Sequence, residues 1–125
     1  MVIVKENKSG LTLKEGIQTL DLQKEFFPKL TNLASTGLTL FDYFGMGDID
    51  NPDIYFMGSF KVEKTGGIYK FINTKTMGVV KFRVDNIKGA QLVDNGKDQA
   101  LVIINKHLVP FYFLFKTRES MAYFV

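Results

Sequence analysis

The sequence has no cysteine and no tryptophan, and His107 is its only histidine. Without cysteine there is no disulfide framework, no thiol nucleophile and no thiolate-bound metal. A single histidine is too few for a multi-histidine transition-metal site. His107 follows Lys106 in a predicted turn, and the sequence places no nucleophile or orienting carboxylate beside it, so we interpret it as solvent-facing. We therefore predict no catalytic residue, no metal site and no cofactor.

Long hydrophobic runs are also absent. The longest uninterrupted apolar stretch, Leu108–Phe115, has eight residues and includes Pro110, whereas a membrane-spanning helix needs about 20. The apolar residues 1–4 are followed at once by Lys5 and Glu6, and such a stretch is too short for the core of a signal peptide. We therefore predict no membrane span and no export signal. Together with the lack of cysteine, this favours a cytoplasmic location.

Charge of one sign is not concentrated enough to define a partner. The formal net charge is +3, whereas a dedicated nucleic-acid binder usually carries a dense basic patch. This argues against nucleic acid, although lysine-bearing strands and aromatic stacking platforms leave a nucleic-acid-associated protein of mobile-element origin as an alternative. With 46% hydrophobic and 23% charged residues, the composition is that of an ordinary globular protein. The length of 125 residues predicts a single domain.

The first part of this domain, residues 1–53, is predicted to be partly helical. Thr12 and Glu15 have the spacing of a capping box, and Ile17 and Leu20 continue at helical spacing, which predicts a helix there. Pro28 then ends or restarts any helix because its ring removes an amide donor.

A second helix is predicted from Leu30 to Phe44. Apolar residues recur there every three to four positions, and Gly37 lies among them. The competing interpretation is a strand over residues 38–44, since threonine and aromatic residues favour extended chain. The stretch that follows, Gly45 to Asp53, is predicted to be a loop on its composition.

The second part, residues 54–125, is predicted to be β-rich. Turn signals recur about every ten residues, beginning with Gly66 and Gly67, which supply the positive φ that tight hairpins need. The predicted strands are Ile54–Lys64, Ile68–Asn73, Val79–Val84, Lys88–Val93, Leu101–Ile104 and Phe111–Phe115. Thr117 then opens a short C-terminal helix. Twelve phenylalanines and five tyrosines predict a core built on aromatic rings. The expected fold is α+β, mainly antiparallel β.

Three segments resemble bacterial pleckstrin-homology-like (PH-like) and GRAM-like domains. Val84–Val93 and Leu101–Ile104 resemble two consecutive strands of these domains, and Phe111–Val125 resembles the last strand and the helix that plugs the barrel. The resemblance covers about residues 55–125, and the first 50 residues have no counterpart in it. It implies a small barrel or curled sheet, and a non-enzymatic binding module. Such a module contacts a protein partner or a second copy of itself, with possible weak affinity for anionic headgroups.

Spaced cations suggest where an anion would bind. Lys75, Lys81 and Arg83 have the shape of the basic signature by which some pleckstrin-homology domains hold inositol phosphates, and lysine and arginine form charge-assisted hydrogen bonds with such groups. The alternative is that these residues form an ordinary solvated face, where lysine also protects a sheet edge from unwanted pairing.

A second candidate is an interaction patch on the last strand. Tyr112 and Leu114 alternate with the phenylalanines of Phe111–Phe115, so they form either part of the core or an apolar patch that another subunit covers. An unpaired sheet edge near Pro110 is a further predicted route to self-association.

Acidic residues group only at Asp48, Asp50 and Asp53. Short carboxylate-rich loops bind calcium, but an EF-hand counted from Asp48 has Asp53 where glycine is required and Ser59 where glutamate is required. We interpret these aspartates as turn formers. A small carboxylate- or metal-dependent enzyme is the remaining alternative function. No phosphate-binding glycine loop is present, because Gly45-Met46-Gly47 precedes no Lys-Ser/Thr pair.

Overall fold

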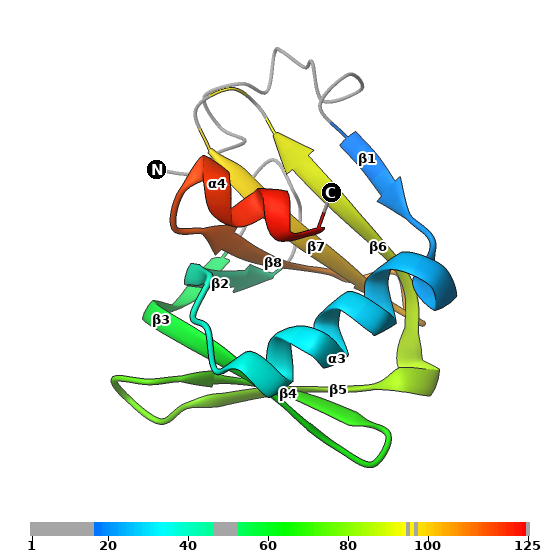
Figure 1. The fold of residues 1–125 in the computed structure, drawn as a ribbon, viewed down its shortest axis with the longest axis horizontal. Coiled ribbons are helices and arrows are strands. Elements are labelled where there is room, and N and C mark those ends of the chain that lie inside the picture. The colour runs from blue at the N-terminus through cyan, green and yellow to red at the C-terminus, as the bar shows by residue number, and fades with distance from the viewer. Residues whose placement is uncertain (1–16, 47–52, 95, 97, 125) are drawn as a thin grey trace.

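The structure, a computed structural model, describes residues 17–46, 53–94, 96 and 98–124. These residues form one eight-stranded antiparallel sheet with short helical segments (Figure 1). The strands are β1 (Ile17–Leu20), β2 (Phe41–Met46), β3 (Asp53–Thr65), β4 (Ile68–Asn73), β5 (Val79–Arg83), β6 (Ile87–Asp94), β7 (Gln99–Asn105) and β8 (Pro110–Phe115). The helical segments are η1 (Leu22–Phe26), α3 (Phe27–Thr36), η2 (Val84–Asn86), α4 (Arg118–Met121) and η3 (Ala122–Phe124). The predicted α+β, mainly antiparallel fold is confirmed.

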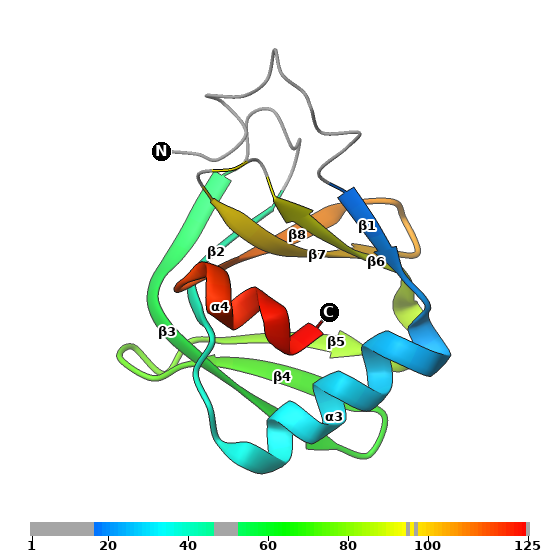
Figure 2. The ribbon, with the colours of Figure 1, turned by 45° about the horizontal axis from the view of Figure 1, so that its top comes forward.

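The sheet is curled but not closed. Its strand order is β1-β6-β7-β8-β2-β3-β4-β5, so β1 and β5 are its edges. The half that contains β6, β7 and β8 faces the half that contains β4 and β5, and α3 and α4 lie beside the opening between them (Figures 1 and 2). The prediction of an unpaired edge near Pro110 was wrong, because β8 pairs with β7 on one side and β2 on the other.

The β-rich half follows its predicted turns closely. β3 and β4 form the predicted hairpin around Gly66, whose φ of +60° requires glycine-like freedom. The next turn is held by Asn73, whose buried side chain accepts hydrogen bonds from the amides of Lys75 and Thr76 at 2.9 and 3.0 Å. The loop predicted from Gly45 to Asp53 is shorter than expected at both ends, since Gly45 belongs to β2 and Asp53 begins β3; residues 47–52 lie outside the described residues.

The helix predicted from Leu30 to Phe44 was wrong in its second half. α3 ends at Thr36, because Gly37 adopts the left-handed conformation (φ +75°) that terminates helices. The chain then extends and enters β2 at Phe41. The competing strand interpretation therefore holds for β2, although the strand begins at Phe41 rather than at residue 38.

The helix predicted to run through Ile17 and Leu20 was also wrong at these residues. They belong to β1, which pairs with β6 in the register Ile17 to Val93 and Leu20 to Ala90. The capping box at Thr12 and Glu15 lies outside the described residues. The cap that the structure shows comes later: the Asp21 carboxylate accepts from the Lys24 amide at 2.9 Å, and Glu25 accepts from the Asp21 amide at 2.7 Å.

Aromatic rings fill the core, as predicted. Phe113 lies at its centre, stacked on Phe71 with ring centroids 4.1 Å apart and edge-on to Phe60 at 5.7 Å. Phe41 of β2 connects this pair to Phe124 of η3, with centroids 6.4 Å apart. α3 supplies buried Leu30 and Leu33 to the same cluster, which also includes Leu20 of β1 and Phe124 of η3. This cluster covers the concave face of the sheet.

The C-terminal helical turn is fastened to the turn between β6 and β7. Thr117 caps α4, as predicted, by accepting from the Ser120 amide at 3.1 Å. Arg118 donates to the Asp94 carboxylate at 2.6 Å and to the Gly96 carbonyl at 2.9 Å. Partial burial alone would raise the pKa of the Asp94 carboxyl group. Hydrogen bonds from Arg118, the Gly96 amide and Gln99 outweigh this effect, together with the positive charge of Arg118. They hold the pKa of Asp94 below its ordinary value of 3.8.

This contact predicts a specific dependence of stability on pH. A carboxylate whose pKa is depressed in the folded state stabilises the fold above its unfolded pKa, and that contribution disappears as the pH falls through the folded value. We expect Arg118→Gln to lower the free energy of unfolding at pH 7 and to lower it less and less below about pH 4. Urea denaturation of both proteins between pH 3 and pH 7 measures this. A difference that stays constant across that range would contradict the assignment.

Candidate binding site

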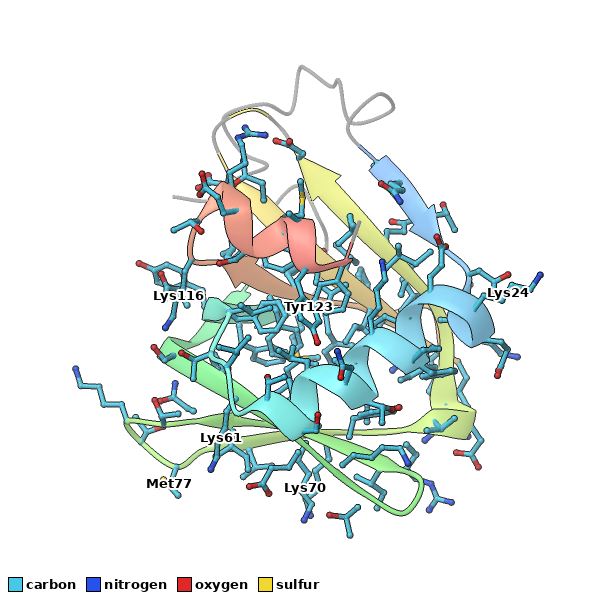
Figure 3. All side chains as sticks on the ribbon, in the orientation of Figure 1. Lys24, Lys61, Lys70, Met77, Lys116 and Tyr123 are labelled. Carbon is cyan, nitrogen blue, oxygen red and sulfur yellow. The ribbon has the colours of Figure 1, made fainter. Side chains whose placement is uncertain are left out.

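The outer face of β3, β4 and β5 carries two of the three predicted cations, Lys81 and Arg83. The core takes Val62, Phe71 and Phe82 from these strands, so the residues at alternate positions face outward. The register places them in three rows: Lys61, Ile72 and Val79; then Glu63, Lys70 and Lys81; then Thr65, Ile68 and Arg83. Lys81 and Arg83 are exposed on the same face of β5, two residues apart. Figure 3 shows Lys70 pointing away from the sheet on this side of the molecule.

Two like charges are opposed across β4 and β5. Lys81 pairs directly with Lys70, and like charges in this position destabilise a sheet. Glu63 lies opposite Lys70 on its other side but is 3.5 Å from the Lys61 ammonium, so its charge is shared. The fold therefore gains nothing from a cation at Lys81 beyond protection of the sheet edge.

No strand of the described part of the chain pairs with the outer side of β5. The amide of Asn73 donates to the Gly78 carbonyl and that of Val84 to the Gly67 carbonyl, at 2.8 and 2.9 Å. In an antiparallel ladder every second residue forms hydrogen bonds with the neighbouring strand. Because Gly78 and Val84 form such bonds, Val80 and Phe82, which lie between them at the same spacing, also point their amides toward β4. The amides of Lys81 and Arg83 consequently point to the free edge, where no described strand pairs with β5.

A small pocket of about 120 Å³ opens at this edge. It is lined by Val80, Lys81, Phe82, Arg83, Asn86, Asn105 and Phe111. Its floor is apolar, formed by the rings of Phe82 and Phe111, whose centroids are 5.2 Å apart in an edge-to-face contact. Since a water molecule takes up about 30 Å³, the pocket has room for a carboxylate or phosphate group. It is too small for a drug-sized ligand, which needs about 300 Å³ or more.

Lys81, Arg83 and Asn105 of the lining have side chains that can donate hydrogen bonds. The Asn105 carboxamide oxygen accepts from the amides of His107 and Val109 at 2.9 and 3.0 Å, which fixes the group and leaves its Nδ2 as the donor. Arg83 contacts Asp85 at 3.4 Å, and both side chains are more than half exposed. Exposed pairs of this kind contribute about 0–1 kcal/mol. Arg83 can therefore exchange Asp85 for an incoming anion at little cost.

The structure brings together only two of the three predicted cations. Lys75 lies in the exposed turn between β4 and β5, next to the start of β5, whereas Arg83 lies at the other end of that strand. Lys75 does not line the pocket. Sequence reasoning missed Asn86 and Asn105, which come from η2 and from the end of β7. Asn105-Lys106-His107 was recognised as a turn signal, but nothing local indicates that this turn lies beside β5.

Tyr112 and Leu114 lie on the face of β8 opposite the core, since Phe111, Phe113 and Phe115 contribute to the core cluster. Tyr112 is nonetheless only 5% exposed and packs with Val93 and Val102 in a second, smaller apolar cluster. Leu114 is half-buried. Within the described residues, these two side chains form no open patch, and neither of them lines the pocket beside β5, although Phe111 of the same strand does.

Of the other candidates, only His107 lies among the described residues with its side chain. His107 is exposed in the turn after β7, as predicted. Asp48 and Asp50 lie outside the described residues, as does the side chain of Asp53. In the part of the chain that is described, no three acidic, histidine or cysteine side chains are grouped to hold a metal. No helix in that same part has the length and apolar content needed to cross a membrane.

A larger groove of about 430 Å³ lies beside α3, but its charges oppose one another. Glu63 and Lys64 both line it, and Lys64 is already engaged, donating to the Gly66 carbonyl at 3.1 Å and lying 5.9 Å above the Tyr69 ring. Thr31, also in the lining, is hydrogen-bonded to the Tyr69 hydroxyl at 2.6 Å. With its polar groups paired internally, this groove offers less to a charged ligand than the β5 pocket.

Comparison with protein-family models, with curated proteins and with solved structures finds no match to this chain.

Proposed function

We propose that this protein is a non-enzymatic binding module that captures an anionic group of its partner in the β5 pocket. The observation that carries the proposal is that Lys81, Arg83 and Asn105 all line one small pocket at the outer edge of β5, to which the amides of Lys81 and Arg83 point. A PH-like architecture is part of the proposal. It is supported by the curled antiparallel sheet and by the helical turn that follows β8 and supplies Phe124 to the core. β1, η1 and α3, which precede β2, are additions to that architecture.

The energetics favour an anion. Ionised donors form hydrogen bonds roughly twice as strong as neutral ones, and the guanidinium of Arg83 can hold two oxygens at once. The apolar floor of Phe82 and Phe111 excludes water from one side of the pocket, which strengthens the attraction between ligand and cations. Lys81 is placed at a cost to the sheet, and sequence choices that conflict with local stability are expected at functional sites.

This reasoning gives a prediction in which stability and binding change in opposite directions. Lys81→Glu replaces a like-charge pair by an opposite-charge pair with Lys70, so we expect the free energy of unfolding to rise by about 0.2–1 kcal/mol. The same variant should bind inorganic phosphate at least about tenfold more weakly, a loss of about 1.4 kcal/mol. Urea denaturation measures the first effect. Titration of the ¹⁵N-labelled protein with phosphate, followed by NMR, measures the second.

Lys24→Glu is the matched control. It makes the same change of charge on η1, which lies apart from β5 (Figure 3). In the unmodified protein and in this control, phosphate should shift the amide signals of Lys81 and Arg83 and the side-chain amide signal of Asn105. Shifts spread evenly over all lysines, or equal binding by Lys81→Glu, would contradict a site at the β5 pocket.

A further inference from the structure

We infer that the free edge of β5 accepts an extended segment of a partner protein as an additional strand, and that this segment alternates acidic, apolar and acidic residues. This inference rests on the proposed function and specifies the class of its ligand. Exposed sheet edges bind peptides in this way elsewhere, with main-chain hydrogen bonds providing affinity and alternate side chains providing specificity.

The backbone of β5 supplies the main-chain partners. The ladder with β4 uses the amides of Val80 and Phe82, which leaves those of Val79, Lys81 and Arg83 directed outward. Three alternate residues with outward amides and carbonyls match the spacing of an added strand, whose own donors and acceptors repeat with the same period. A lipid headgroup has no comparable row of groups to pair with them.

The side chains of β5 define the sequence of the segment. Residues of the added strand alternate between the two faces of the sheet, as those of β5 do. On the outer face, two residues would lie beside Lys81 and Arg83, so these should be acidic. The residue between them would face the pocket floor formed by Phe82 and Phe111, so it should be apolar.

A second copy of this chain is a poor occupant of the edge. An antiparallel pairing of two β5 strands centred on Lys81 places this lysine opposite its own counterpart. A shift of the register by one step in one direction places Lys81 opposite Arg83 of the other copy. These two arrangements oppose like charges directly, which destabilises the pairing. A step in the other direction places Lys81 opposite Val79, which adds no charge complementarity. Charge complementarity therefore selects an acidic partner.

A membrane surface is also disfavoured by the charges around the site. Glu63 shares the outer face with Lys70 and Lys81, and Asp85 lies 3.4 Å from Arg83. Attraction to an anionic bilayer grows with the number of uncompensated cations near its surface, and this face is mixed. A segment with only two acidic residues needs only Lys81 and Arg83.

The probe for this inference is a fluorescein-labelled peptide with the sequence Ser-Thr-Glu-Val-Glu-Thr-Ser, and binding is followed by fluorescence anisotropy. Two variants separate the charge of Lys81 from its amide. Lys81→Gln removes the charge alone, and we expect binding to weaken up to about fivefold. Lys81→Pro also removes the outward amide, which edge strands tolerate, and should weaken binding by about a further tenfold.

Amide hydrogen exchange gives a second readout that requires no variant. Addition of the peptide should slow exchange at Val79, Lys81 and Arg83, and should leave the amide of Lys24 unchanged. N-methylation of the peptide's two glutamates, whose amides would face β5, should abolish this protection. Equal binding by Lys81→Gln and Lys81→Pro, or no slowing at the β5 edge, would overturn strand addition.

The phosphate titration keeps the two proposals distinguishable. Phosphate binding without peptide binding overturns the strand inference and leaves the proposed function standing. Loss of both overturns both. The last measurement is pelleting of the protein with vesicles that contain phosphatidylserine. If pelleting depends on Lys81 and Arg83 while the peptide does not protect the β5 amides, the site binds lipid headgroups. That result would overturn the inference.

Discussion

Phe113→Ala should lower the free energy of unfolding by about 3–5 kcal/mol, the range found when buried aromatic residues are truncated. Phe113 has no exposed surface, and its ring contacts those of Phe71, Phe44 and Phe41 with centroids 4.1, 5.0 and 5.5 Å apart. These rings come from β4 and β2, on strands that lie on the same side of β8 in the sheet order. Truncation would leave a cavity where the curled sheet meets itself, and neighbouring rings in different strands cannot all move to fill it.

An effect of this size would remove a large part of the stability of the protein, since domains are stable by about 5–15 kcal/mol. Urea denaturation followed by circular dichroism measures it. The control is Leu108→Ala, in a turn where the side chain is 75% exposed; it should change stability by no more than about 0.5 kcal/mol. A loss below about 1 kcal/mol for Phe113→Ala would show that the rings are loosely packed.

The β-rich half was predictable because its turns are chosen locally. Gly66, with its positive φ, determines where the first hairpin reverses, and Asn73 closes the next turn with its own side chain. Alternation of Val80, Phe82 and Val84 with charged residues identified the inner face of β5 correctly at Val80 and Phe82, which contact the core cluster. These signals act within a few residues, so a single sequence contains them.

The N-terminal half failed for a physical reason that is visible at two residues. Gly37 fitted the apolar period of a helix, but its ability to take positive φ made it the helix end. Ile17 and Leu20 have a spacing that suits a helix, and pairing with β6 overrides it. Asp21 followed by Glu25 was the local signal that would have placed the helix start correctly, since both carboxylates satisfy free amides there.

The site was only half predictable. Lys81 and Arg83 were named because the spacing of Lys75, Lys81 and Arg83 resembles the basic signature of some pleckstrin-homology domains. Asn105 is distant in sequence, and it comes beside β5 only through the order in which eight strands pair. Whether a strand lies at an edge also depends on every other strand, which is why Pro110 was mistaken for an edge and β5 was not identified as one. Long-range pairing is the information that local patterns lack.

Gly58 lies at one of the bulges of the curled sheet. This residue and Ser59 together oppose the single residue Asp42 of β2, so β3 contains a bulge just before it exchanges β2 for β4 as its main partner. Gly58 has φ +129°, a conformation that other residues rarely adopt. The bulge bends β3, as its long curved course in Figure 2 shows. That bend turns β4 and β5 toward β8.

Gly58→Ala should therefore destabilise the protein by about 1–3 kcal/mol, the cost of holding a non-glycine residue in such a conformation. Direct collision does not explain the effect, because the added Cβ would lie 3.4 Å from the Asn73 carboxamide, an ordinary contact distance. Gly67→Ala is the matched control. Its Cβ would meet no atom within 4 Å and its φ is not positive, so it should be neutral or stabilise by up to about 1 kcal/mol.

The same pair of variants tests whether the bend of β3 shapes the pocket. If Gly58→Ala folds with β3 straightened, β5 moves away from Phe111 and Asn105, and phosphate should bind more weakly than to Gly67→Ala under conditions where both are folded. Urea denaturation and the phosphate titration together decide this. Equal stability of the two variants would show that β3 bends without the positive φ of Gly58. Unequal stability with equal phosphate affinity would show that the pocket is set by η2 and the turn after β7 instead.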